Sequence, residues 1–249
     1  MISLDNISKV FNKGEVNEVT ALKNISLTIN KEDYVVIVGA NGSGKTTLLN
    51  IISGAERSSS GKVMINGEDA TRFAEYKRSK WIARVFQNPY TGTASDLTIL
   101  DNFRLAALRT QSKKLSIGIN ASFKKKVQDM IAKLGMGLEN KIDQLMGSLS
   151  GGQRQALTML MSVMDDAKIL LLDEPTAALD PKSAASVLEL ANQLIKEYHL
   201  TALCITHNLK DAHQYGTRLI QFKEGNILRD LDEEQKSNTS LQDMFGWFE

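Results

Sequence analysis

The stretch Gly39 to Thr47 has the residue spacing of a phosphate-binding loop. It reads Gly-Ala-Asn-Gly-Ser-Gly-Lys-Thr-Thr and fits the pattern G-x-x-x-x-G-K-[ST]. In that pattern Lys45 would reach the β- and γ-phosphates of a nucleoside triphosphate, and the Thr46 hydroxyl would hold Mg²⁺. Composition alone produces such a match in about one chain in a hundred of this length. The stretch therefore predicts that the protein binds ATP or GTP.

Asp173 and Glu174 could act on a bound triphosphate. They end the apolar run Lys168-Ile-Leu-Leu-Leu-Asp-Glu174, which is typical of a buried parallel strand that carries its last side chains to the edge of a sheet. Asp173 could ligate Mg²⁺ through water, and Glu174 could orient or deprotonate an attacking water. The alternative is that both acids only cap the following helix.

A second helix start could also bind an anion. In Ser148-Leu-Ser-Gly-Gly-Gln-Arg-Gln155, Ser150 and Gln153 have the spacing of a capping box and precede a mostly apolar run. The glycine-rich, positive N-terminus of such a helix attracts phosphate. A chain with two helix starts of this kind either binds two phosphates or shares one nucleotide between two copies.

The flanking segments predict the elements that position these residues. Tyr34–Val38 indicates a buried strand before the first loop, and Thr46–Ser53 a helix after it. Ile2–Ile7 and Ile25–Ile29 alternate apolar and polar residues, so we expect an antiparallel pair joined by a loop containing Gly14. Further strands are expected at Gly61–Gly67, which ends in an Asn-Gly turn, and at Ile82–Phe86, Thr201–Ile205, Thr217–Phe222 and Asn226–Asp230.

From about Leu97 to Met164 the apolar residues follow a helical period, which predicts an inserted helical subdomain. One face carries Ile99, Phe103, Ala106 and Ala107, and another carries Val127, Ile131 and Leu134. Within this segment Lys124–Lys126 is interpreted as a solvated helix face, with contact to lipid headgroups as the alternative. Pro181 begins an amphipathic helix that turns Val187, Leu190, Ala191 and Leu194 inward, and a short helix is expected near Leu241–Phe248.

Two single residues allow more than one interpretation. Phe11 could stack on an adenine ring or belong to a small satellite core. His207 follows a buried strand and could donate a hydrogen bond to a γ-phosphate, whereas a histidine alone in this position more often has a structural role.

The composition limits the classes of partner. The 249 residues are 42% hydrophobic, enough for a sizeable core, and 30 Lys and Arg balance 29 Asp and Glu, so no basic surface for nucleic acid is indicated. The single cysteine, Cys204, lies in an apolar run and is expected in the core of a protein of a reducing compartment. We expect neither a signal peptide nor a membrane span, so a membrane role would need another chain.

The phosphate-binding loop is accompanied by the segments Leu149-Ser-Gly-Gly-Gln153 and Leu170–Asp180. Through these motifs together, the chain resembles an ATP-binding cassette (ABC) transporter ATPase over essentially all of its length. The resemblance implies an α/β P-loop NTPase fold with a mostly parallel sheet flanked by helices, an N-terminal antiparallel β subdomain and an inserted α-helical subdomain. Residues 1–90 and 165–249 would form the RecA-like core with the β subdomain, and residues 91–164 the helical subdomain with the signature motif.

The resemblance also assigns roles to residues and implies a Mg²⁺-dependent ATPase. Gln87 would be the Q-loop glutamine, Asp173 and Glu174 the Walker B acids, Asp180 the D-loop aspartate and His207 the switch histidine. ATP would be bound by Phe11, Gly39, Ala40, Asn41, Gly42, Ser43, Gly44, Lys45, Thr46 and Thr47. The catalytic residues would be Glu174, His207, Gln87 and Lys45. Mg²⁺ would be bound by Thr46, Gln87 and Asp173. Since the family's sites are composite, Leu149, Ser150, Gly151, Gly152 and Gln153 would act on the ATP of a second copy in a homodimer.

One departure from the usual family sequence indicates which branch of the family the chain resembles. Most members follow the signature with a helix of the type Q-R-V-x-I-A-R-A-L, whereas this chain has Arg154-Gln-Ala-Leu-Thr-Met-Leu-Met-Ser162. With Asn17–Leu22, Glu75–Arg78 and Gly92–Ala94, it resembles the ATPases of a less characterised bacterial branch of uptake systems, some assigned to tryptophan or other amino acids. Such systems use a separate permease and an extracytoplasmic substrate-binding protein, which implies a cytoplasmic subunit on the inner face of the cell membrane.

The leading expectation is therefore the energy-coupling subunit of an importer. An exporter or lipoprotein-extraction ATPase is the first alternative, because its N-terminal half would look much the same. A non-transport ABC ATPase of translation or DNA repair would carry two cassettes or a long coiled-coil insertion, and the 62 positions from Gln87 to Leu149 (149 − 87) leave no room for either.

Overall fold

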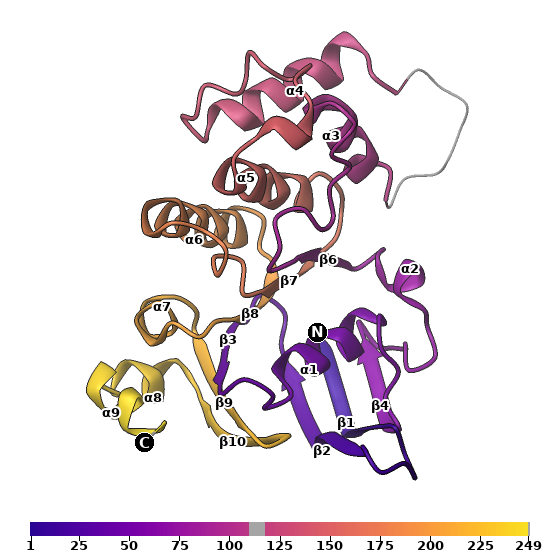
Figure 1. Ribbon diagram of the computed structural model, residues 1–249, viewed down its shortest axis with the longest axis vertical. Coiled ribbons are helices and arrows are strands. Elements are labelled where there is room, and N and C mark those ends of the chain that lie inside the picture. Colours follow the sequence, from indigo (N-terminus) through magenta and orange to yellow (C-terminus); the bar gives the residue numbers. More distant parts are fainter. Residues whose placement is uncertain (110–117, 249) are drawn as a thin grey trace. The chain divides into compact units, whose positions relative to one another are not determined.

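The computed structural model describes residues 1–109 and 118–248, which fall into two compact units (Figure 1). The first unit contains residues 1–78, 171–174 and 200 onward, and the second contains residues 79–170 and 175–199. Strand β7 (Ile169–Asp173) contributes its last three residues to the first unit and its first two to the second. The second unit includes the described part of the expected helical subdomain, of which residues 110–117 lie outside the described residues.

An antiparallel sheet opens the first unit. Its strands are β1 (Ile2–Phe11), β2 (Val19–Ile29), β4 (Ser60–Ile65) and β5 (Glu68–Asp69), in the order β2-β1-β4-β5. Ile2 pairs with Ile29 on one side and with Ile65 on the other, which confirms the predicted pairing of the two N-terminal segments. Buried isoleucines and leucines alternate with more exposed residues along β1 because only one face of the sheet is covered.

The second sheet of this unit places strand ends side by side. It contains β3 (Tyr34–Gly39), β8 (Thr201–Ile205), β9 (Arg218–Lys223) and β10 (Asn226–Leu231), in the order β10-β9-β3-β8 with the end of β7 beyond β8. Strand β3 is parallel to β8 and β9 and, like β8, is buried along its whole length, including Cys204. Uninterrupted apolar sequence therefore marks the strands whose two faces are both covered.

Buried cations fix the helices of the first unit. These helices are α1 (Lys45–Ser53), α2 (Glu75–Arg78), α7 (Leu209–Gln214), α8 (Glu233–Ser237) and α9 (Leu241–Gly246). Arg78 donates to the carbonyls of Ile51 and Ile52 at the end of α1, over 2.6 and 2.9 Å. Lys236 donates to the carbonyls of Tyr215 and Gly216 just after α7. Figure 1 shows α7, α8 and α9 gathered beside β9 and β10.

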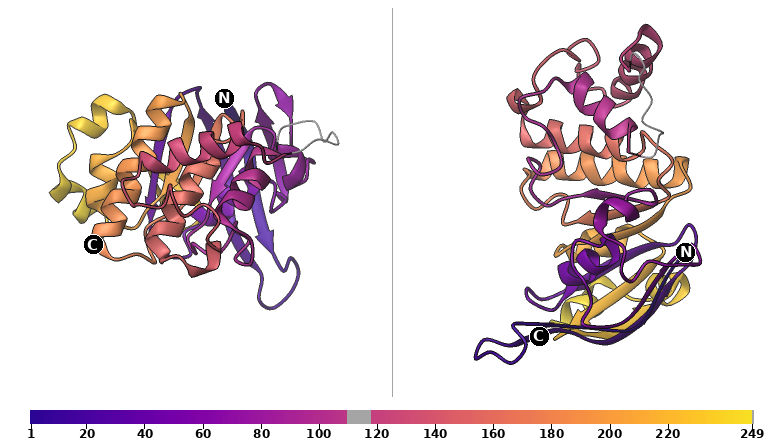
Figure 2. Two further views of the ribbon diagram at one scale, coloured as in Figure 1. Left: turned by 90° about the horizontal axis from the view of Figure 1, so that it is seen from above. Right: turned by 90° about the vertical axis from the view of Figure 1, so that its right-hand side faces the viewer.

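The second unit is mainly helical. It contains β6 (Ile82–Val85), α3 (Ile99–Ala107), α4 (Ala121–Ala132), a 3₁₀ turn at Met146–Ser148, α5 (Gly151–Ser162) and α6 (Pro181–Glu197). Helices α5 and α6 lie side by side in both views of Figure 2, and nearly every residue of α5 is buried. Strand β6 lies beside the start of β7, because the Trp81 carbonyl accepts from the amides of Lys168 and Ile169. No helix of the described residues has the length and apolarity to cross a membrane.

The helix faces differ from prediction at single positions. On α6, Val187, Ala191 and Leu194 are buried as expected, but Leu190 is only half-buried and Leu188 and Ile195 take its place in the core. Ala106 on α3 is likewise half-buried, and Leu134 lies beyond the end of α4. A sequence period locates the centre of an apolar face, whereas the neighbouring elements decide how wide the buried stripe is. Lys124, Lys125 and Lys126 are exposed, as the interpretation of a solvated face requires.

Candidate functional site

Lys45 is the first residue of α1, and its side chain reaches back to the loop that follows β3. Its ammonium donates to the carbonyls of Gly39 and Ala40 over 2.8 and 3.0 Å, and the residue is only 4% exposed. Burial lowers the pKa of Lys45, while the negative charges of Glu174 and Asp173 act in the opposite direction. The ammonium of Lys45, held by two backbone carbonyls, is thus a suitable counter-charge for a phosphate.

Among the described residues, no side chain caps the backbone amides at the start of α1. Helix α1 begins after Gly44, whose φ of 104° is left-handed and whose position gives the helix no side-chain cap. A Cβ at Gly44 would lie 2.4 Å from the Ala21 carbonyl oxygen, so no other residue fits there. The Ser43 hydroxyl oxygen is buried and has no hydrogen-bond partner among the described residues. Uncapped amides and a buried hydroxyl next to Lys45 fit the oxygens of a bound polyphosphate.

Carboxylates approach this loop from the neighbouring strands. The Thr46 hydroxyl donates to Oδ1 of Asp173 over 3.3 Å, although 127 residues separate the two in sequence. Glu174 has a left-handed φ of 48°, and its amide donates to the Ile205 carbonyl over 3.1 Å. Its Oε1 lies 2.5 Å from Nε2 of His207. The ends of β3, β7 and β8 therefore bring a cation, two acids and a histidine to one edge of the sheet.

The alternative role of the two acids, capping the next helix, is wrong. Asp180 caps α6, because its Oδ1 accepts from the amides of Lys182 and Ser183 over 3.1 Å each. Hydrogen bonding to Ser183 lowers the pKa of Asp180. Neither Asp173 nor Glu174 is therefore the N-cap of α6.

The oxygens of Thr46 and Asp173 fit the chemistry of Mg²⁺. A hydroxyl and a carboxylate are hard donors, and Mg²⁺ commonly takes only one or two protein ligands, with waters and phosphate oxygens completing its octahedron. In residues 1–109 and 118–248, no group of three or more His, Cys, Asp or Glu side chains is arranged to hold a metal by itself. Gln87, the third predicted ligand, is an exposed residue of the second unit just after β6.

The signature segment has the predicted helix start. The Ser150 hydroxyl accepts from the Gln153 amide over 3.3 Å, and the Gln153 side chain accepts from the Ser150 amide over 3.1 Å, which confirms the capping box. Ser150 is exposed at the start of α5, whereas Leu149 and Gly152 are buried. A Cβ at Gly152 would lie 2.7 Å from the Ser183 hydroxyl, so glycine allows α5 to approach α6.

Phe11 stands at the end of β1, where its half-buried ring carries the ammonium of Lys9 at 4.5 Å from the ring centroid. Lys9 is itself held by Glu56 over 2.9 Å. One face of the ring is therefore covered by a fixed cation, and Phe11 does not belong to the buried core. Stacking of Phe11 on adenine stays a prediction.

Sequence reasoning missed Gln155. Its side-chain amide donates to the carbonyl of Phe86, which precedes Gln87, and to that of Pro175, which follows Glu174, over 3.0 and 2.8 Å. Buried Arg154 beside it donates to the Met146 carbonyl. The signal was present as two large polar residues directly before a mostly apolar run, but nothing in the sequence named their distant partners. These bonds fix the start of α5 to the loop that carries Gln87 and to the segment that follows Glu174.

Comparison with known proteins gives concordant matches. Residues 22–177 match the family model described as ABC transporter. The chain is 39% identical to a tyrosine transport ATP-binding protein of Clostridioides difficile (strain R20291), over 100% of this chain and 99% of that protein. It is 30% identical to methionine import ATP-binding protein MetN 1 of Staphylococcus aureus (strain USA300), covering 92% of this chain and 64% of that protein.

It is also 34% identical to the macrolide export ATP-binding/permease protein MacB of Mannheimia succiniciproducens, over 96% of this chain but only 36% of that longer protein. Among solved structures, a dimeric post-hydrolysis state of the ATP-binding cassette MJ0796 bound to ADP and Pi matches with a TM-score of 0.80 and 29% identity, over 94% of this chain and 99% of that one. The match confirms the predicted fold of a mostly parallel sheet flanked by helices with an antiparallel N-terminal sheet.

Proposed function

Because this chain belongs to the ABC transporter family and is an ATPase cassette, we propose that it is the energy-coupling subunit of a bacterial system that imports a small solute such as an amino acid. The observation that supports an amino-acid substrate most directly is the similarity, along nearly the full length of both chains, to a protein described as a tyrosine transport ATP-binding protein. The similarity to a methionine import subunit supports the same direction of transport.

In this proposal the loop residues bind ATP and the strand ends carry out the chemistry. Lys45 leaves the carbonyls of Gly39 and Ala40 to bind the β- and γ-phosphates, together with the amides of α1. Thr46 and Asp173 would hold Mg²⁺, which would neutralise phosphate charge when bound. Glu174 accepts a proton from the attacking water.

His207, now paired with Glu174, turns to donate a hydrogen bond to the γ-phosphate. The Glu174 carboxylate is thereby left to orient the water.

We further propose that two copies complete each site. The exposed Ser150 at the start of α5 then acts on the ATP bound by the other copy, with Gly151 to Gln153 contributing amides. Closing and reopening of this homodimer would drive a membrane permease that receives its substrate from an extracytoplasmic binding protein. The permease would hold the subunit on the cytoplasmic face of the membrane.

Export is the second candidate, because the macrolide export relative is 34% identical. Proteoliposomes distinguish the two directions. The chain would be reconstituted with its proposed permease partner, and the vesicles would be loaded with the cognate binding protein and a labelled amino acid. Import predicts that ATP, added on the side of the ATPase, releases label to that side, and that Glu174→Gln stops the release. With the label supplied on the ATPase side instead, ATP-dependent accumulation of label inside the vesicles would support export.

A further inference from the structure

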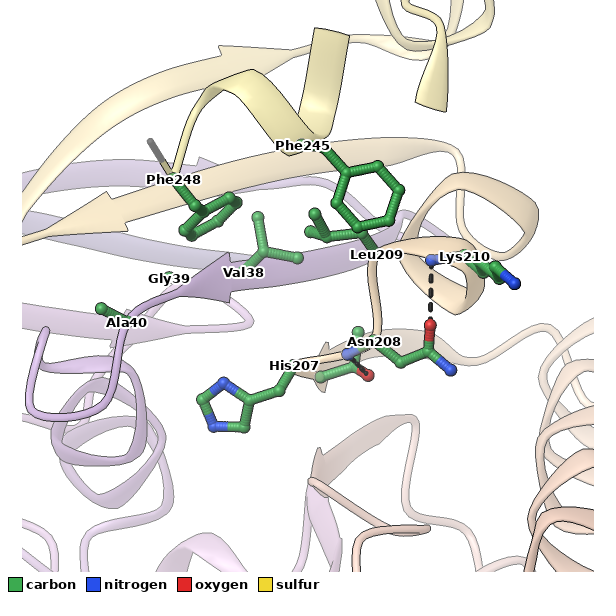
Figure 3. Close-up of a pocket in the computed structure, with 10 residues that line it drawn as sticks. Val38, Gly39, Ala40, His207, Asn208, Leu209, Lys210, Phe245 and Phe248 are labelled. Carbon is green, nitrogen blue, oxygen red and sulfur yellow. Dashed lines mark hydrogen bonds between the residues drawn. The ribbon is translucent and has the colours of Figure 1, made fainter. Parts of the chain in front are cut away.

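A cavity of about 380 Å³ lies in the first unit, beside the phosphate loop and the segment that carries His207 (Figure 3). Its lining comes from the ends of β3 and β8, the start of α7, and the C-terminal helix α9. The lining residues are Val38, Gly39, Ala40, Thr206, His207, Asn208, Leu209, Lys210, Phe245 and Phe248. The volume is at the small end of the range for pockets that bind small molecules.

The aromatic wall of the cavity is exposed but held in place. Phe245 and Phe248 are 49% and 43% exposed, and Figure 3 shows their rings directed toward Val38 and Leu209. The wall is anchored because Met244 is fully buried and the Trp247 carbonyl accepts from the Gln221 side chain over 3.2 Å. Two exposed rings, one on α9 and one just after it, offer a surface on which a flat apolar molecule can pack.

The polar part of the lining favours a negative charge. The Thr206 hydroxyl accepts from the Asn208 amide over 3.1 Å, and the Asn208 side chain accepts from the Lys210 amide over 3.0 Å, as the dashed lines in Figure 3 mark. Both side chains are thus occupied in ordering the segment. Lys210 is exposed at the rim, and no ion pair joins it to an acid of the described residues. It is the charged group that a ligand could use.

We propose that this cavity binds a small planar aromatic molecule with one acidic group, packed against Phe245 and Phe248 with its charge near Lys210, and that binding slows ATP hydrolysis. The effect on ATP hydrolysis rests on the proposed function. The cavity wall includes Gly39 and Ala40, whose carbonyls hold Lys45, and His207, which is paired with Glu174. A ligand wedged between α9 and residues 206–210 keeps His207 with Glu174 and so away from the γ-phosphate.

Binding is tested by calorimetric titration of the full chain with 2-naphthoate, alone and with a saturating non-hydrolysable ATP analogue. The expected result is saturable binding that the analogue does not displace. Absence of saturable binding up to about 10 mM, a weak limit for a ligand of this size, would overturn the proposal. Displacement by the analogue would also overturn it, because the compound would then occupy the nucleotide site.

Matched variants and compounds test the chemistry. Combined Phe245→Ala and Phe248→Ala should weaken binding at least about tenfold, the effect of losing two ring contacts. Lys210→Gln should weaken it about threefold or more. Leu228→Ala and Lys223→Gln, which change an exposed apolar and an exposed charged residue outside the cavity, should leave binding unchanged. Neutral 2-naphthamide and non-aromatic cyclohexanecarboxylate should bind more weakly, and equal binding of all three compounds would contradict the proposed ligand class.

Hydrolysis is measured on the same proteins. In the wild type, 2-naphthoate should lower kcat with little change in KM for ATP, and in the double phenylalanine variant, which keeps its basal turnover, it should have no effect. Unchanged kcat at saturating 2-naphthoate would overturn the regulatory part. Saturable, phenylalanine-dependent binding to a chain without ATPase activity would instead count against the proposed function while supporting the binding site.

Discussion

Glu174 has a left-handed backbone conformation, with φ at 48°, that residues other than glycine rarely adopt. Its Oε1 lies 2.5 Å from Nε2 of His207. We predict that Glu174→Gln keeps ATP affinity within a few-fold but lowers steady-state hydrolysis at least about 100-fold, because an amide can orient water but cannot take its proton. Nucleotide titration and phosphate release measure the two quantities separately.

The matched control for this change is Glu224→Gln. Glu224 is also a glutamate with a left-handed φ, 50°, but it lies exposed in the turn between β9 and β10. The control removes the same charge from the same backbone conformation, so it should hydrolyse ATP at the wild-type rate. If Glu174→Gln retained turnover within a few-fold of this control, the carboxylate would not be the catalytic base.

Lys236 makes stability depend on pH. Burial lowers the pKa of its ammonium from 10.5 to about 8, with Glu233 opposing the shift. Between these two pH values the unfolded chain binds more protons than the folded one, so the contribution of Lys236 to the free energy of unfolding should rise with pH. Relative to Lys236→Met, the wild type should gain up to about 3 kcal/mol from pH 8 to 10.5. Urea unfolding across this range measures the gain.

The neutral amine of Lys236 can still donate to the carbonyls of Tyr215 and Gly216, so the gain does not require loss of these bonds. Lys223→Met, at an exposed lysine of the same unit, shows the effect of removing a surface ammonium. A free-energy difference between wild type and Lys236→Met that stays flat or falls over this pH range would refute the assignment.

At the scale of elements, Arg78 is the tie between helix α1 and the segment before α2. Its guanidinium donates to the carbonyls of Ile51 and Ile52, as well as to those of Phe73 and Thr71, and the residue is 1% exposed. We predict that Arg78→Met lowers the free energy of unfolding by about 2 to 4 kcal/mol, because the carbonyls that end α1 lose their donor while buried. Denaturant unfolding measures the loss.

Lys77→Met is the neighbouring control, since Lys77 is exposed and has its ammonium over the Phe73 ring at 5.5 Å. Its effect should stay within about 0.5 kcal/mol, as for most surface substitutions. Equal losses in the two variants would mean that the buried hydrogen bonds of Arg78 contribute nothing specific to the position of α1.

At the scale of the whole molecule, the proposed sharing of each ATP between two copies predicts complementation. Lys45→Ala and Ser150→Arg should each be inactive as homodimers, but a mixed dimer collects both lesions in one site and leaves the other intact. An equal mixture should therefore regain up to about a quarter of wild-type activity if the sites act independently, since about half of the dimers are mixed and each has one intact site. Phosphate release after mixing measures the recovery.

If hydrolysis needs two intact sites, the mixed dimer stays inactive even when each site is shared. Labelling then tests whether the two copies share each ATP. In the mixed dimer, a photoreactive γ-phosphate analogue of ATP is bound by the chain that retains Lys45. Sharing predicts that the label attaches to the other chain, the Lys45→Ala chain that still carries Ser150. Label confined to the chain that binds the nucleotide would show that the signature segment acts within its own copy.

The sequence by itself determined the features that depend on local conformation. The loop at Gly39–Thr47 and the capping box at Ser150 and Gln153 are readable because a few consecutive dihedral angles and nearby hydrogen bonds define them. The strands at Tyr34–Gly39 and Thr201–Ile205 were equally readable, since burial on both faces requires an unbroken apolar run.

Only the tertiary structure decided which distant residues meet. Thr46 meets Asp173 because β3 and β7 end at the same edge of the sheet, and Gln155 finds the Phe86 and Pro175 carbonyls across loops far apart in sequence. The cavity beside His207 exists because α9 packs near α7 and the residues that follow α9 approach the end of β3. No local pattern encodes such pairings, because they depend on how the whole chain buries its apolar faces and satisfies its buried polar groups.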